Sequence, residues 1–426
     1  MREIKVLLNE VETKKQDERL KEIYVDEQVL AYQKKRYQEA VRKFEELYGA
    51  GEAEIYSAPG RSEVGGNHTD HQHGEVLAAS INLDAIAVVR KTSEAIIELL
   101  SEGYQKITVD LSDLEKKDSE EGTSVGIIRG MVYGLKKNGH SIGGFKAYIT
   151  SDVLNGAGMS SSAAFEVLVG TIISGLYNNM EISPVEIAQV AQYAENVFFG
   201  KPCGLMDQMA CSVGGLIHID FADPKAPVVE KVEVDFAAYS HSLCITDTKG
   251  SHADLTDDYA MIPQEMKKVA EFFGKEFLRE VDEKEFYKKI AELQKACGDR
   301  AVLRSLHFFE EDKRVKQEVD ALKHDDFKGF LQTVKASGNS SFNYLQNVYT
   351  NKDVQNQGVS IGLAVSDSIL GKHGVCRVHG GGFAGTIQAF VEDEFVENYR
   401  TMLDSVFGEG ACHVLKVRPF GGIKVM

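Results

Sequence analysis

The sequence contains few of the residues that mark a disulfide-bonded, zinc-stabilised or membrane-spanning protein. Its 426 residues include six cysteines, and no two of them form a Cys-x-x-Cys pair. This spacing indicates neither a zinc ribbon nor a disulfide framework, so we expect reduced thiols. No apolar run approaches the length of a membrane span, and residues 1–17 mix acidic and basic side chains without a continuous apolar core. We therefore expect a cytoplasmic protein.

The chain has fewer basic residues than acidic residues. The chain has 48 lysines and arginines against 65 aspartates and glutamates, which gives a formal net charge of −17. A field of this sign repels phosphate, which argues against nucleic acid or an anionic membrane as a partner. An anionic small ligand would need local positive groups or backbone amides. The oligomeric state stays open, and a monomer is compatible with the sequence.

The chain is too long for one ordinary core, so we expect two lobes. A proline-bearing stretch at residues 223–227 interrupts the pattern, which indicates a boundary between Asp220 and Leu243, and we draw it after residue 232. No internal repeat or low-complexity tract is present. The patterns predict helices at 14–48, 124–137, 161–178, 184–199 and within 265–331, and strands at 55–57, 75–90, 95–100, 107–111 and 145–151.

The segment from Ala58 to Gly74 combines glycines, an arginine and several titratable side chains. Gly65 and Gly66 let the backbone turn or pass close to a ligand, and His68 and Asp70 supply donors and acceptors at the same place. A purely structural turn would need the glycines but not the polar cluster. We therefore interpret the segment as a binding loop that carries chemistry.

A transition-metal site is an alternative for this loop. His68, Asp70, His71 and His73 are metal-ligand types at close spacing. The metallo-β-lactamase pattern His-x-His-x-Asp-His, however, would need a histidine where this chain has Gly66. No second group of histidines and aspartates completes a binuclear site farther along the chain, so the metal hypothesis lacks ligands.

A second glycine-rich stretch, residues 154–164, runs directly into the helical pattern that ends at Asn178. Backbone N–H groups at a helix N-terminus, together with the helix dipole, form a phosphate cradle. Serine hydroxyls in the first turn can bind a phosphate oxygen or Mg²⁺, although serine is also a common N-cap without a ligand. The stretch matches neither a Walker motif nor a nucleophile elbow.

A third stretch runs from Arg377 to Thr386. Gly380, Gly382 and Gly385 formally match a dinucleotide-binding fingerprint. That fingerprint requires a helix next, whereas residues 387–391 have the pattern of a strand. The context therefore argues against a dinucleotide-dependent oxidoreductase.

In this order the three stretches resemble the motifs of the galactokinase, homoserine kinase, mevalonate kinase and phosphomevalonate kinase superfamily, and within it the galactokinase family. The first galactokinase motif reads Gly-Arg-Val-Asn-Leu-Ile-Gly-Glu-His-Thr-Asp-Tyr, and the second, Gly-x-Gly-Leu-Ser-Ser-Ser-Ala, corresponds to residues 156–163. Residues 200–208 match Gly-x-Pro-Cys-Gly-x-Met-Asp-Gln almost throughout. The resemblance begins near Tyr37 and leaves residues 1–36 as an extension. The first motif is matched by Gly60, Arg61, Gly66, His68, Thr69 and Asp70.

The resemblance implies an α+β fold with an N-terminal lobe (37–232), a C-terminal lobe (233–426) and an active site between them. It implies an ATP-dependent kinase that phosphorylates the anomeric hydroxyl of galactose or a galactose-like sugar. Asp207 would accept or orient the hydroxyl proton beside Arg61, as phosphoryl transfer requires. Mg²⁺ would lie on Ser161 and Glu195. The sugar would contact Asn67, His68, Asp70, Gly204 and Tyr259, and ATP would contact Gly156, Gly158, Ser160, Ser161 and Ser162.

Two departures from the family pattern concern the substrate. Galactokinases carry glutamate where this chain has Asn67, and tyrosine where it has His71. By resemblance that glutamate contacts the C6 side of the sugar, and an asparagine amide there could donate to a carboxylate without charge repulsion. Plant galacturonate kinases also carry the run Asp-His-Gln, which this chain has at Asp70, His71 and Gln72. A galacturonate 1-kinase is therefore the alternative. A sugar sensor without catalysis is a third hypothesis, and the presence of the proposed catalytic and metal-binding residues argues against it.

Other departures concern the nucleotide and the sugar-stacking helix. The family's tryptophan and tyrosine before the second motif fall near Ser124 and Ile127, so the nucleotide pocket must be lined differently. The basic residues that follow the family's sugar-stacking tyrosine are replaced by residues 260–264 after Tyr259. Met159 for leucine and Ala384 for glycine are mild changes.

Overall fold

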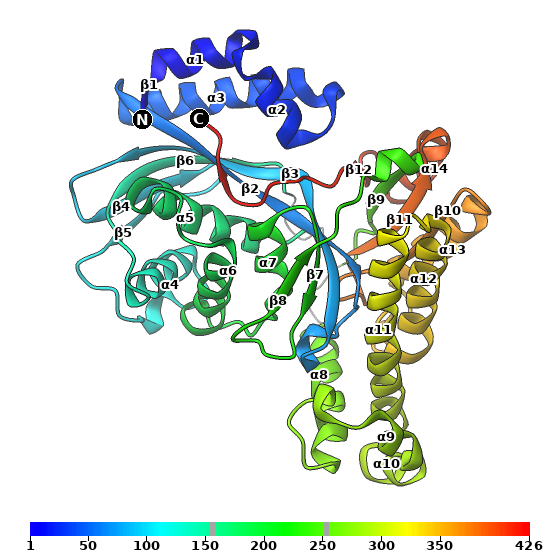
Figure 1. Cartoon of the computed structure of the whole chain (residues 1–426). Coiled ribbons are helices and arrows are strands. Elements are labelled where there is room, and N and C mark those ends of the chain that lie inside the picture. Colours follow the sequence, from blue (N-terminus) through cyan, green and yellow to red (C-terminus); the bar gives the residue numbers. More distant parts are fainter. Residues whose placement is uncertain (154–157, 251–254) are drawn as a thin grey trace.

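The computed structural model describes residues 1–153, 158–250 and 255–426. Within these residues the chain forms a nine-stranded mixed sheet, mainly from its first half, and a four-stranded antiparallel sheet from its second half (Figure 1). The change from one sheet to the other falls between the strand that ends at Lys231 and the strand that begins at His241, next to the lobe boundary drawn after residue 232.

The large sheet is built on two long antiparallel strands, β2 (Glu52–Gly65) and β3 (Glu75–Lys91). Its main path runs β1, β2, β3, β6, β4, β5, and only the β4–β6 pair is parallel among the pairs of this sheet within the described residues. β13 pairs with β2, β7 pairs with β3, and β8 pairs with β7. The remaining strands are β1 (Arg2–Glu3), β4 (Ile96–Ser101), β5 (Ile107–Asp110), β6 (Phe145–Ser151), β7 (Leu216–Asp220), β8 (Val228–Lys231) and β13 (Ile423–Lys424).

Helices cover both faces of this sheet (Figure 1). Because strand side chains alternate between faces, Ile55 and Val88 pack toward α1, α2 and α3, whereas Tyr56 and Ala87 pack toward α4, α5 and α6. These helices and their neighbour are α1 (Ile4–Glu12), α2 (Asp17–Tyr24), α3 (Leu30–Tyr48), α4 (Ser124–Lys137), α5 (Ser161–Asn178), α6 (Pro184–Tyr193) and α7 (Met206–Val213). The division expected after residue 36 falls inside α3, and side chains from residues 1–36 share an apolar core with the large sheet.

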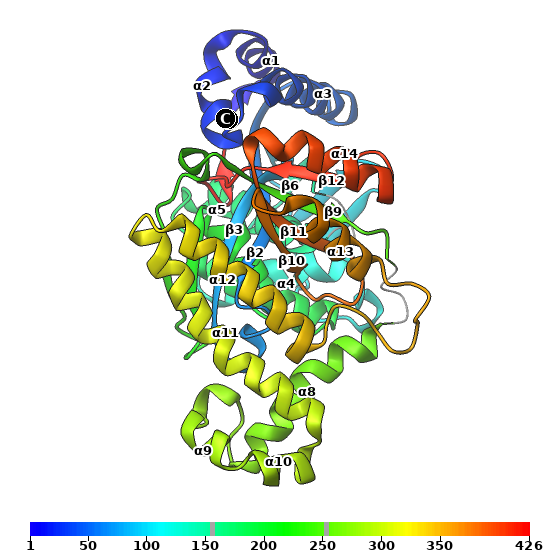
Figure 2. The same cartoon turned by 90° about the vertical axis from the view of Figure 1, so that its right-hand side faces the viewer.

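The small sheet has the order β10, β11, β9, β12. Its alternating side chains again face two layers: Cys244 points toward α13 and α14, and Ile245 toward α11 and α12. α11 and α12 lie side by side, and α8, α9 and α10 lie near one end of α11 (Figure 2). The bounds are β9 (His241–Asp247), β10 (Gly374–His379), β11 (Thr386–Glu392), β12 (Cys412–Leu415), α8 (Thr256–Phe272), α9 (Glu283–Lys288), α10 (Ile290–Cys297), α11 (Asp299–Lys323), α12 (Phe327–Ser340), α13 (Gly358–Leu370) and α14 (Val396–Phe407).

One apolar cluster joins the two lobes. It contains Val64 and Leu77 from the large sheet, Val315 and Phe330 from α11 and α12, and Phe390 from the small sheet. The lobes therefore share buried surface that stabilises their relative position. None of the helices in the described residues is both long and apolar enough to span a membrane.

Candidate active site

The centre of the site is a paired arginine and aspartate. Arg61, on β2, donates from Nε to Oδ1 of Asp207 at 2.6 Å and from Nη2 to Oδ2 at 2.8 Å, and Asp207 lies in the first turn of α7. The Ser160 hydroxyl also donates to Asp207. Burial raises the pKa of Asp207, but the Arg61 guanidinium and these hydrogen bonds outweigh burial and hold the pKa below its usual value. Asp207 is therefore ionised at neutral pH.

The start of α5 adjoins this pair. Ser160 is the N-cap residue, has a left-handed φ of 55° and makes no capping hydrogen bond, because its hydroxyl binds Asp207 instead. Ser161 is the first residue of the helix, and the Gly158 carbonyl accepts from Arg61. Gly156 lies outside the described residues. The N-terminus of α5 therefore presents its N–H groups next to the Arg61–Asp207 pair, where a phosphate would be stabilised.

A pair of buried carboxylates lies beside the same helix. Gln208 donates from Nε2 to Glu195 at 2.8 Å and to Glu166 at 3.1 Å, and Lys201 Nζ lies 3.4 Å from Glu195. Burial, followed by the charge of Glu195, raises the pKa of Glu166 well above its usual value. Oε1 of Glu166 has no hydrogen-bond partner in the described structure. Ser161, Glu166 and Glu195 line one cavity, a set of hard oxygen atoms that suits Mg²⁺.

Contacts link several of the expected sugar residues to one another and to the third glycine-rich stretch. A Cβ on Gly204 would clash with Oδ2 of Asp70, so this position requires glycine in the observed arrangement. His68 Nε2 lies 3.3 Å from the Gly381 carbonyl, and the Tyr259 hydroxyl donates to the Gly382 carbonyl at 2.7 Å. The third glycine-rich stretch, the loop between β10 and β11, therefore contacts three of the expected sugar residues, because the Gly380 carbonyl also accepts from Asn67.

His68 is uncharged. Burial, reinforced by the charge of His71, lowers the pKa of His68 to about 3. The ring can donate or accept one hydrogen bond at each nitrogen but brings no positive charge to the site.

Asn67 is fully buried and directed into the protein. Its Nδ2 donates to Glu63 at 3.0 Å and to the Gly380 carbonyl at 2.7 Å, and its Oδ1 accepts from Asn347 at 2.8 Å. Glu63 is also buried and lies 2.5 Å from Nη2 of Arg377. Both amide hydrogens of Asn67 are thus bonded to protein atoms.

The metal alternative for the loop finds no support in the described residues, where no three His, Cys, Asp or Glu side chains are placed to hold one ion. His73 instead stacks on Phe277, with ring centroids 3.6 Å apart. His71 stacks on His68 at 5.6 Å.

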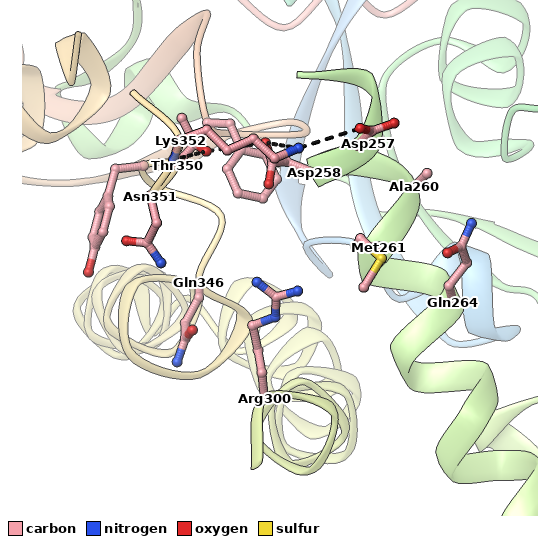
Figure 3. Close-up of a pocket in the computed structure, with 12 residues that line it drawn as sticks. Asp257, Asp258, Ala260, Met261, Gln264, Arg300, Gln346, Thr350, Asn351 and Lys352 are labelled. Carbon is pink, nitrogen blue, oxygen red and sulfur yellow. Dashed lines mark hydrogen bonds and ion pairs between the residues drawn. The ribbon is translucent and has the colours of Figure 1, made fainter. Parts of the chain in front are cut away.

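Two cavities of about 490 Å³ each lie near these residues. One is lined by Ser161, Ser162 and Glu195 together with apolar side chains, so it continues from the start of α5. The other is lined by Phe383 of the third glycine-rich stretch and by polar residues, with Lys352 Nζ 3.6 Å from Asp257 and 3.4 Å from Asp258 (Figure 3). Only the first cavity includes residues of a proposed phosphate site.

Comparison with known proteins agrees with this geometry. The family model described as "GHMP kinases N terminal domain" matches residues 126–215, and the "Galactokinase galactose-binding signature" matches residues 42–91. The chain is 30% identical over 376 residues to a galactokinase of Actinobacillus pleuropneumoniae serotype 3, covering 87% of this chain and 93% of that protein. The chain belongs to the galactokinase family. A galactokinase of Streptomyces coelicolor is 28% identical over 387 residues, with 90% and 96% covered.

Solved structures support the same assignment. The structure of Lactococcus lactis galactokinase complexed with galactose matches with a TM-score of 0.77 and 25% identity, covering 90% of this chain and 98% of that one. A mevalonate kinase structure matches with a TM-score of 0.59 at 16% identity, covering 85% and 99%, which shows the fold alone. The predicted two-lobed α+β fold is therefore confirmed. As a member of the galactokinase family the protein is a sugar kinase that uses ATP.

The motifs did not single out Glu166, Glu63 or Arg377. A usable signal for Glu166 was present: it is an acidic residue within α5, whose other residues are small, polar or apolar, and acidic side chains are rarely buried without a reason. The Glu63–Arg377 contact joins positions 314 residues apart, and no sequence pattern indicates that pairing.

Proposed function

We propose that the protein transfers the γ-phosphoryl group of ATP to the C1 hydroxyl of galactose, giving galactose 1-phosphate and ADP. The observation that carries the proposal is the two-point Arg61–Asp207 pair next to the N-terminus of α5. The galactokinase relatives and the likeness to a galactokinase complexed with galactose support the choice of sugar. We include in the proposal a cytoplasmic location, without nucleic acid or membrane as a partner.

In the proposed reaction the C1 oxygen forms a bond to the γ-phosphorus as the bond from that phosphorus to the ADP oxygen breaks. The hydroxyl proton passes to the Asp207 carboxylate. Because Arg61 lowers the pKa of Asp207, the carboxylate is a weak base and takes the proton only once the new bond is largely formed. A loose transition state requires little more of the base. Orientation of the sugar hydroxyl by Asp207 and charge stabilisation by Arg61 therefore account for most of the catalytic effect of this pair.

We propose that the Ser161 hydroxyl and the Glu195 carboxylate hold Mg²⁺, with Glu166 next to them. Their hard oxygen atoms and the unpartnered Oε1 of Glu166 fit this ion. When bound there, Mg²⁺ would neutralise negative charge on the phosphates of ATP. Lys201 and Gln208, which contact Glu195, keep that carboxylate in place.

A neutral sugar fits this site better than a uronic acid. The galacturonate hypothesis depended on a free amide at Asn67, yet both of its N–H groups are bonded to Glu63 and Gly380. His68 is uncharged, and Arg61 is paired with Asp207. A sugar carboxylate would therefore meet no unpaired cation among these residues, and Asp70 would repel it.

The test is a coupled assay of ADP formation with galactose, glucose, galactosamine and galacturonate as acceptors. We expect turnover with galactose and not with galacturonate. Phosphorus NMR of the product should show coupling to the anomeric proton. Turnover of galacturonate alone would reverse the choice of sugar, and no turnover with any acceptor would favour the sensor hypothesis.

A further inference from the structure

α3 connects the N-terminal extension, residues 1–36, to the end of β6. Asp152 directly follows that strand, and three donor side chains of α3 surround its carboxylate. Tyr32 donates its hydroxyl to Oδ1 at 2.8 Å, Gln33 donates from Nε2 to Oδ2 at 3.3 Å, and Arg36 Nη1 lies 2.9 Å from Oδ2. Positions three and four apart share one face of a helix, so a single face of α3 holds this carboxylate.

Arg36 also binds the strand beside β6. Its Nη1 donates to Oδ1 of Asp84 at 2.7 Å, and its Nη2 donates to the Asp84 carbonyl at 2.8 Å and to the Thr150 carbonyl at 3.2 Å. The Asp152 N–H donates to that same Asp84 carbonyl at 2.9 Å. One buried guanidinium therefore fastens β3 to the end of β6.

The residues next to these contacts line the cavity beside α5. Ala85 and Ser151 are directly paired across β3 and β6, and both line this cavity together with Val153 and the serines of the proposed phosphate site. Asp84 and Ala85 are neighbours on β3, so their side chains point to opposite faces of the sheet. α3 and α5 cover these two faces (Figure 1). α3 therefore holds, from one face, the backbone whose other face lines the cavity.

We propose that Arg36 and Tyr32 are positioning residues for the proposed phosphate site: by holding Asp152 they keep Ser151 and Val153 in place in the wall of the cavity. The inference rests on the proposed function, because it takes ATP as the ligand of this cavity. Binding groups have to be held within about 0.5 Å of their productive positions, so a small displacement of this wall weakens binding. The N-terminal extension thus has a role in ATP binding besides its share of the apolar core.

Steady-state kinetics test the role of Tyr32. This side chain is 54% exposed, so Tyr32→Phe removes one hydrogen bond to Asp152 and leaves the core intact. The KM for ATP should rise by roughly threefold to tenfold, while the KM for galactose and the turnover number stay nearly unchanged. An unchanged KM for ATP would overturn the proposal.

Tyr24→Phe is the matched control. It removes a hydrogen bond of 2.9 Å to Asp84, in the same network but away from Asp152. It should lower the stability of the protein in urea and leave both KM values unchanged. A rise in the KM for ATP as large as that of Tyr32→Phe would show that loss of stability alone is sufficient, and would contradict the positioning role.

Calorimetric titration with a non-hydrolysable ATP analogue tests Arg36 without turnover. Arg36→Met removes the guanidinium from both aspartates, and Asp84 keeps a cation because Arg418 donates to it at 2.8 Å. The Kd for the analogue should rise roughly tenfold, and the Kd for galactose should not change. Arg36→Lys keeps the charge and should recover part of the affinity.

Binding and turnover distinguish this inference from the proposed function. An unmodified protein that binds the analogue but phosphorylates no sugar would contradict the proposed function, and weaker binding by Arg36→Met would still support the positioning role. Normal galactose turnover, with the same Kd for the analogue in the unmodified protein and in Arg36→Met, would contradict the positioning role alone.

Discussion

Nδ2 of Asn67 lies 3.0 Å from Oε1 of Glu63, four positions earlier in the chain and within β2. The galactokinase motif has asparagine and glutamate at these two positions in the opposite order. A carboxylate and an amide thus remain in contact, but here the carboxylate belongs to residue 63 and lies 2.5 Å from Arg377. The exchange moves a negative charge away from the sugar residues and into an ion pair that links β2 with β10.

We predict that the two positions are coupled in stability. Glu63→Asn removes the carboxylate from Arg377, a fully buried guanidinium, and should cost about 3–5 kcal/mol of unfolding free energy. Asn67→Glu places a second carboxylate against Glu63 and should also destabilise the fold. The double exchange restores the family's order and should cost at least about 1 kcal/mol less than the sum of the two changes. Urea denaturation measures all three variants, and strict additivity would contradict the coupling.

Asp207→Asn should separate catalysis from binding. The amide cannot accept the hydroxyl proton, so we expect the turnover number to fall by about a hundredfold to ten-thousandfold. Calorimetric titration with galactose should still show binding, because the other sugar contacts remain. Asp118→Asn, an exposed aspartate on the surface, is the control. A fully active Asp207→Asn protein would remove this residue from the reaction.

Gly204→Ala should weaken sugar binding selectively. The added Cβ would clash with Oδ2 of Asp70, so the carboxylate must move away from its observed position. We expect the KM for galactose to rise by about tenfold, the cost of one misplaced hydrogen bond, while the KM for ATP stays the same. Gly274→Ala, at a left-handed position with open space around it, should cost stability but leave both KM values unchanged. Equal changes in both KM values for Gly204→Ala would point to a general distortion instead.

Acid should destabilise the loop that contains Asn67 through Glu311. This buried carboxylate accepts from the Asn67 N–H at 3.4 Å and from Arg314 Nε at 2.6 Å. Burial raises its pKa, but His307 and Arg314 outweigh burial and lower the pKa to about 2. Because the unfolded value is about 4.3, the stabilisation is complete above that pH and is lost as the pH falls toward 2. About 3 kcal/mol is involved.

The variant that checks this is Glu311→Gln. Its unfolding free energy should be lower at neutral pH and should change less steeply between pH 4.5 and pH 2 than that of the unmodified protein. The readout is urea denaturation at several pH values. Parallel curves for the two proteins would show that Glu311 does not titrate in this range.

Local patterns predicted several elements closely. The pattern over residues 161–178 corresponds to α5, and the one over 124–137 corresponds to α4, because small and apolar residues at helical spacing decide local structure when a helix is buried. The expected helix at 184–199 instead changes to a π-helix at Ala194–Phe199, the segment that carries Glu195. A wider turn of this kind depends on packing and leaves no periodic signal.

The sequence patterns did not predict the direction in which individual side chains point. The spacing of His68, Asp70, His71 and His73 allowed a metal site, but His73 turns to stack on Phe277 from another segment. Asn67 was expected to face the sugar, and its burial depends on Asn347 and Gly380, about 280 and 313 residues away. Contacts at such separations arise from the fold as a whole, so motif matching cannot supply them.

The carbonyls of Gly380, Gly381 and Gly382 contact Asn67, His68 and Tyr259 in turn. Two of these partners belong to the loop after β2, more than 300 residues earlier in the chain. The proposed sugar site therefore forms only when the last part of the chain has docked on the first. Affinity for galactose should accordingly be a late signal during refolding, and a bound sugar should hold both lobes together until they melt in one step.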